Sequence, residues 1–122
     1  MKIYAIFILA HLLADFLFQP DSLIKLKGTS HKKGQFWNKG IFWHSLIHFG
    51  TMLILLLMYA ELRIETLLAA LCVFVCHYLI DRFKFQWKLN EIWKFVLDQL
   101  AHYVIIYLVL WAFRLVIIPQ AL

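Results

Sequence analysis

The chain has 122 residues, enough for one domain, and 64% of them are hydrophobic while only 16% are charged. A water-soluble protein of this size could not bury so much apolar surface, so the composition excludes a soluble domain and indicates an integral membrane protein. The net charge of +5 comes from basic residues that fall between apolar runs, which is typical of membrane orientation and not of nucleic-acid binding.

The order of apolar runs predicts an all-α fold, an integral membrane four-helix bundle that forms a single transmembrane domain over 1–122. The first helix is short for a membrane span and is stopped by Pro20. The last helix is capped by Asn90 and ends at Pro119. The helices are expected at about 3–19, 40–60, 66–82 and 91–118.

Two basic segments connect these helices. The first, 20–39, contains five lysines, and the second, 83–90, alternates basic or polar residues with apolar ones. Alternation normally indicates a β-strand, but a lone strand at a membrane surface has no partner. We therefore expect an interfacial segment there, with aromatic side chains in the lipid and cations at the headgroups.

The distribution of Lys and Arg predicts the orientation of the bundle. Nine of these residues lie in or beside segments 20–39 and 83–90, and three lie at the opposite ends of the helices. Because cytoplasmic loops carry the excess of positive charge, both segments are expected in the cytoplasm and both termini on the non-cytoplasmic side. The expected location is the bacterial cytoplasmic membrane, with membrane lipids as partners and a homo-oligomer left open.

Four pairs of ionisable residues interrupt the apolar runs, and the two members of each pair are four positions apart. Residues at this spacing share one face of a helix. An ionisable group inside a membrane is costly and is usually retained for function. The pairs are His11 and Asp15, His44 and His48, His77 and Asp81, and Asp98 and His102.

All four pairs are expected at one depth in the cytoplasmic half of the bilayer. Helices that run towards the cytoplasm carry their pair near the C-terminal end, and helices that run away from it carry their pair near the N-terminal end. The pairs then form two layers: an outer one of Asp15, His44, Asp81 and Asp98, and an inner one of His11, His48, His77 and His102.

This set of residues predicts a divalent metal site. A carboxylate near the bilayer centre costs about 2.5–3.5 kcal/mol, and a bound cation would offset that cost. Imidazole nitrogens and carboxylates suit zinc first, with manganese or iron as alternatives. A metal-free polar or proton-relay network and a haem site also stay open. Gln19 and Gln99 are expected to orient the ligands.

The basic residues beside the site are assigned a second role. Lipid headgroups and phosphates are anionic, so cations at the membrane surface attract them. The residues expected to meet a headgroup or phosphate are Lys32, Lys33, Arg82 and Lys84.

The sequence resembles a known family over nearly its whole length. The motifs that carry the resemblance, all in order, are His11-Leu-Leu-Ala-Asp15-Phe-Leu-Phe-Gln19-Pro, His44-Ser-Leu-Ile-His48, His77-Tyr-Leu-Ile-Asp81 and Asp98-Gln99-Leu-Ala-His102. As a set they resemble the domain of unknown function 3307 family of small bacterial and phage membrane proteins, which implies a membrane protein but no activity. More loosely, the His/Asp pairs look like those of membrane-bound metal-dependent hydrolases, by analogy only.

Three functions are consistent with this pattern. The leading one is a metal-dependent hydrolase of a lipid or lipid-linked phosphate. The first alternative is a metal-ion or proton transporter or channel subunit. Against it, the run Met52–Met58 contains no polar side chain that could bind an ion on its way across the outer half of the membrane. The second alternative is a structural or regulatory membrane subunit whose polar network holds no metal.

Overall fold

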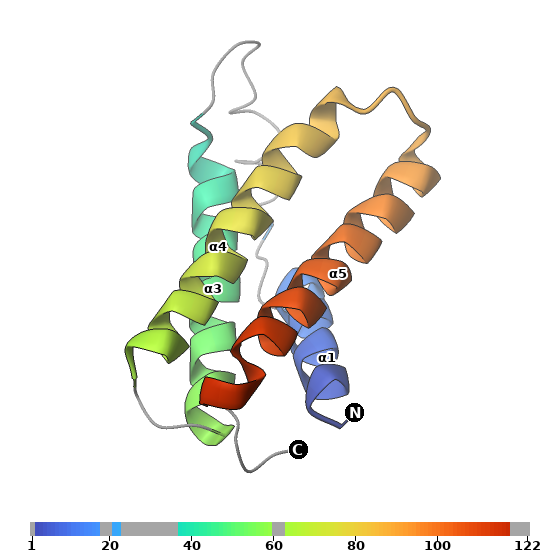
Figure 1. Cartoon of the computed structure of the whole chain (residues 1–122). Coiled ribbons are helices and arrows are strands. Elements are labelled where there is room, and N and C mark those ends of the chain that lie inside the picture. The colour runs from blue at the N-terminus through green and yellow to red at the C-terminus, as the bar shows by residue number, and fades with distance from the viewer. Residues whose placement is uncertain (1, 18–20, 23–36, 60–62, 118–122) are drawn as a thin grey trace.

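The chain folds into helices, and the prediction of an all-α fold with four α-helices is confirmed for the residues that the structure describes (Figure 1). This computed structural model describes residues 2–17, 21–22, 37–59 and 63–117, and none of them forms a strand. The elements are α1 (Lys2–Phe16), α3 (Lys39–Tyr59), α4 (Ile64–Phe83), the 3-10 helix η1 (Lys84–Gln86) and α5 (Glu91–Ile117).

Three of the helices are long and apolar enough to cross a membrane. The qualifying stretches of α3 and α4 each have a mean hydropathy of 1.8, and that of α5 has 1.6. Helix α1 has 15 residues. At 1.5 Å per residue it is about 22 Å long, less than the hydrocarbon core of about 30 Å. The predicted extension of the first helix to residue 19 lies partly outside the described residues.

The helices form a closed ring (Figure 1). Helix α3 packs beside α4, α4 beside α5, and α1 contacts both α3 and α5. Successive helices run in opposite directions, so the start of α1 and the end of α5 lie at the same end of the bundle. The first and last helices of the chain are therefore neighbours.

An apolar core fills the end of the bundle at which α1 begins. Because small side chains allow helices to approach closely in a membrane, Ala69 and Ala70 bring α4 against its neighbours. The polar pairs lie beyond this core, towards the other end. The buried residues of the core are Phe7, Met52, Leu56, Ala69, Ala70, Val73, Ile106 and Leu110.

Asparagines start two of the helices. Asn38 Oδ1 accepts a hydrogen bond from the Ile41 N–H of α3 at 2.9 Å, and the Asn38 N–H donates to the Tyr78 hydroxyl at 3.0 Å. Asn90 Oδ1 accepts from the Trp93 N–H of α5 at 2.9 Å, which confirms the predicted cap. Both helices thus begin at a fixed residue near the polar end of the bundle.

The segment between α4 and α5 contains a single 3-10 turn and no strand. Helix α4 passes directly into η1, and the Trp87 N–H closes that turn by donating to the Lys84 carbonyl at 3.1 Å. The turn places Lys84 over the polar end of the bundle, beside the start of α5.

Candidate metal centre

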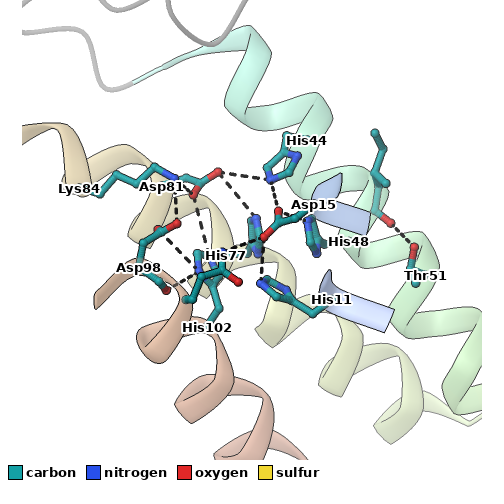
Figure 2. Close-up of polar contacts among 12 residues, drawn as sticks. His11, Asp15, His44, His48, Thr51, His77, Asp81, Lys84, Asp98 and His102 are labelled. Carbon is teal, nitrogen blue, oxygen red and sulfur yellow. Dashed lines mark hydrogen bonds and ion pairs between the residues drawn. The ribbon is translucent and has the colours of Figure 1, made fainter. Parts of the chain in front are cut away.

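All eight ionisable residues of the helix pairs come together in one cluster between the four helices (Figure 2). Seven of them are buried, and the side chain of Asp15 is 15% exposed. Each helix contributes one pair, whose two members share a helix face because they are four residues apart. The cluster consists of His11, Asp15, His44, His48, His77, Asp81, Asp98 and His102.

Asp15 is the hub of one half of the cluster. Its Oδ1 lies 3.1 Å from the Nε2 atoms of both His44 and His48. Its Oδ2 lies 3.3 Å from His11 Nε2 and accepts a hydrogen bond from Gln99 Nε2 at 3.0 Å. One carboxylate on α1 is thereby joined to α3 and to α5.

Asp81 is the hub of the other half. Its Oδ2 lies 3.6 Å from His44 Nε2 and 3.7 Å from His77 Nε2. Its Oδ1 lies 2.9 Å from Lys84 Nζ and 3.9 Å from His102 Nε2. His44 Nε2 therefore contacts both hubs.

The Lys84 ammonium joins two carboxylates of the cluster. Besides Asp81, its Nζ contacts Asp98 Oδ2 at 3.1 Å. Burial disfavours the charged amine, but the charges of Asp81 and Asp98 outweigh that effect and raise the pKa of Lys84 above its ordinary value. The amine is therefore a fixed positive charge at this edge of the cluster.

The backbone fixes the tautomer of His102. Its Nδ1 lies 2.7 Å from the Asp98 carbonyl oxygen, which can only accept a hydrogen bond, so Nδ1 carries the proton. The lone pair is then on Nε2, which faces Asp81. A backbone hydrogen bond of this kind is how metal-binding imidazoles are usually oriented.

Two overlapping groups have the composition and spacing of metal ligands. One ligand atom from each of Asp15, His44, His48 and His77 lies within 4.8 Å of every other, and the same holds for His77, Asp81 and His102. Tetrahedral zinc with bonds of about 2.0–2.1 Å separates its ligand atoms by about 3.3 Å, so the 3.1 Å contacts to Asp15 already match that spacing. The first group could supply up to four ligands to one metal ion.

The groups divide by helix and not by the two predicted layers. The first group joins α1, α3 and α4, the second joins α4 and α5, and His77 belongs to both. Asp15, placed in the outer layer by its depth, contacts His48 of the inner layer. His11 and Asp98 lie outside both groups, but each contacts a member.

Several buried atoms of the cluster make no hydrogen bond to any described residue. An unsatisfied buried polar atom costs about 1–3 kcal/mol. Four of the atoms are imidazole nitrogens of the two ligand groups, and a bound metal would satisfy each nitrogen that coordinates it. The atoms are His11 Nε2, His44 Nδ1, both ring nitrogens of His77, His102 Nε2 and Asp98 Oδ1.

A pocket of about 210 Å³ leads from the surface to the cluster. Its lining combines charged side chains at the end of α4 and the first turns of α5 with one aromatic ring. Asp98 is the pocket residue that belongs to the cluster. The lining residues are Lys84, Glu91, Lys94, Phe95 and Asp98.

Two contacts were not anticipated from the sequence. The Tyr103 hydroxyl donates to Gln99 Oε1 at 3.1 Å, which orients the amide that holds Asp15. Lys84 lies between carboxylates, although the sequence placed it with the groups that meet a headgroup. The available signals were spacings: Tyr103 follows Gln99 by four residues, and Lys84 follows Asp81 by three.

Four other residues were predicted to orient the ligands or to meet a headgroup. Arg82 is buried at 6% exposure near the end of α4. Gln19, Lys32 and Lys33 fall outside the described residues, so their predicted roles stay predictions.

Comparison with known proteins agrees with the resemblance seen in the four motifs. Searches of curated proteins and of solved structures found no significant match. A family profile matches residues 3–120, nearly the whole chain, including all four His/Asp pairs. The chain therefore belongs to the family described as protein of unknown function (DUF3307).

Proposed function

We propose that this chain is an integral membrane, metal-dependent hydrolase that acts on a lipid or lipid-linked phosphate. The observation that carries the proposal is the ligand group Asp15, His44, His48 and His77, whose donor atoms lie within 4.8 Å of one another. Zinc is the first candidate for the metal, because three imidazoles and one carboxylate are donors that it prefers.

The buried imidazoles favour a metal centre over a metal-free network. His77 is 2% exposed and neither ring nitrogen has a hydrogen-bond partner among the described residues. The His48 and His77 rings stack with centroids 3.9 Å apart, which brings ring nitrogens together instead of pairing them with donors or acceptors. A cation between the nitrogens would compensate for both features.

The apolar core favours a reaction site over a conduit. Beyond His11 and His48 lies a cavity of about 20 Å³, with room for about one water molecule. The buried side chains next along the bundle are apolar, among them Met52, Leu56 and Leu110. Among the described residues, the pocket at Asp98 offers the centre a polar approach from one end of the bundle, whereas transport requires a polar path at both ends.

In this proposal Asp98, which lines the pocket, is the general base. Asp98 Oδ1 makes no hydrogen bond to a described residue, and the carboxylate lines the pocket. A divalent metal in the ligand group would polarise water and a phosphoryl oxygen. In the proposed reaction Asp98 takes a proton from water as the water oxygen bonds to phosphorus. The P–O bond to the lipid alcohol breaks, and the departing oxygen receives that proton.

The position of the pocket favours an anionic lipid as substrate. Lys84 and Lys94 line the pocket, while Trp93 and Phe95 at the start of α5 are more than half exposed. Aromatic rings at this level are typical of the membrane interface, where headgroups lie. We place this end of the bundle on the cytoplasmic side of a bacterial membrane, because Lys and Arg are concentrated there.

Metal analysis of the purified protein tests the proposal. The protein is prepared in mild detergent without chelator and with an affinity tag that lacks histidine, and its metal is measured by mass spectrometry. The expected result is about one zinc ion per chain and metal-dependent phosphate release from phosphatidic acid or a prenyl diphosphate in micelles. Protein that is folded and contains no metal above the buffer level would overturn the proposal.

A further inference from the structure

We propose that Lys84 occupies the position of a second divalent cation and thereby limits the centre to one metal ion. This inference rests on the proposed metal centre and concerns the second ligand group. The Lys84 Nζ lies 2.9 Å from Asp81 Oδ1 and 3.1 Å from Asp98 Oδ2, so the ammonium joins two carboxylates as a bridging metal ion would.

The groups around the ammonium are those of a metal site. His77, Asp81 and His102 place ligand atoms within 4.8 Å of one another. His102 is 3% exposed, its lone pair is on Nε2, and that atom has no hydrogen-bond partner among the described residues. Asp98 Oδ1, on the other side of Lys84, also lacks one. A buried nitrogen and a carboxylate oxygen thus remain available beside the amine.

Charge balance explains why the amine takes this position. The cluster contains three carboxylates, those of Asp15, Asp81 and Asp98. The Lys84 ammonium contacts two of these, Asp81 and Asp98. With the imidazoles neutral, as metal ligands must be, one divalent ion together with Lys84 balances the three negative charges. Removal of the ammonium takes one positive charge away from Asp81 and Asp98, and a second divalent ion would then be attracted to the site.

The pocket gives a second ion a route to this position. Lys84 and Asp98 both line the pocket of about 210 Å³, and the Lys84 side chain is 22% exposed. A shortened or neutral side chain at residue 84 therefore leaves the two carboxylates open to an ion from the surface.

The test is the zinc stoichiometry of three variants in detergent, measured by mass spectrometry after equilibration with zinc and removal of the excess. Wild type is expected to bind about one zinc ion per chain, and Lys84→Met about two. Lys84→Arg keeps the positive charge and is expected to stay at about one. Lys94→Met removes a lysine from the same pocket, where it pairs with Glu91 at 2.9 Å, and is the matched control, also at about one.

The outcomes separate this inference from the proposed function. If wild type binds one ion and Lys84→Met also binds one, or if wild type already binds two, Lys84 does not set the stoichiometry and the inference is overturned. If wild type binds none, the proposed metal centre itself fails. Lys84→Gln provides a second neutral variant. Failure of both neutral variants to fold even with zinc present would also overturn the inference, because the second ion should replace the missing charge.

Discussion

The Nε2 atom of His48 on α3 lies 3.1 Å from Oδ1 of Asp15 on α1, although 33 residues separate them in the sequence. The same oxygen lies equally far from His44. One carboxylate oxygen on a short helix thus contacts two imidazoles of its neighbour, at a distance close to the separation of about 3.3 Å between the ligand atoms of tetrahedral zinc.

Replacement of His48 by alanine is expected to remove the metal. The change deletes one of four ligands, and even groups that only orient ligands are worth about 10–100-fold in affinity, so the loss should exceed about 100-fold. Zinc content and competition with a fluorescent chelator measure the effect. Thr51→Val, one turn further along α3, removes a hydroxyl that bonds the Ile47 carbonyl at 2.9 Å and should keep full zinc content.

Replacement of Gln99 by leucine is expected to weaken metal binding without abolishing it. Gln99 donates to Asp15 Oδ2 at 3.0 Å, and its loss frees the carboxylate to rotate, which should cost about 10–100-fold in zinc affinity. Tyr103→Phe should show a smaller loss in the same direction, because it releases only the Gln99 amide. Tyr107→Phe is the control, because Tyr107 lies one turn further along α5 and is half exposed. Equal zinc affinities for the Gln99 variant and wild type would contradict the positioning role.

Replacement of Asp98 by asparagine is expected to stop hydrolysis while the first metal site stays filled. Asp98 is in neither ligand group, and loss of a general base typically lowers the rate by about 10²–10⁴-fold. Phosphate release and zinc content are measured on the same sample. Glu65→Gln makes the same chemical change in the first turn of α4, at the opposite end of the bundle, and should keep wild-type activity. Joint loss of metal and activity in the Asp98 variant would assign this carboxylate to the metal instead.

Truncation of Leu56 is expected to destabilise the bundle but not the centre. Leu56 is fully buried in the apolar core, and packing is the main force between membrane helices, so Leu56→Ala should cost about 2 kcal/mol or more. Ile54→Ala on the same helix removes a side chain that is 64% exposed and should change stability little. Thermal unfolding in detergent, followed by circular dichroism, compares the two. A zinc content that falls with Leu56→Ala at 25 °C would show that core and centre are coupled.

The sequence predicted much of the fold because the apolar runs are long and their polar interruptions are regular. The ends of the expected helices at 40–60, 66–82 and 91–118 lie within two residues of the ends of α3, α4 and α5. The eight ionisable residues were identified from a spacing of four and a common depth, since both follow from helix geometry.

The partners within the site could not be predicted in the same way. By depth in the membrane, His44 is level with Asp15, whereas His48 is one helical turn deeper. The His48 imidazole is long enough to span that turn, so Asp15 contacts both His44 and His48. Lys84 lies on a segment whose alternating pattern concealed a 3-10 turn, and that turn directs its amine onto Asp81. Side-chain reach and local backbone turns decide such contacts, and the hydrophobic pattern records neither.

The ring of helices is closed by its first and last members, and this has a consequence for biosynthesis. Asp15 and Gln99, which join α1 to α5, are separated by 84 residues. Until the ribosome has made α5, the α1 carboxylate lacks that partner. The centre therefore cannot be completed before α5 is synthesised, and truncated products that lack α5 leave Asp15 without the amide that orients it.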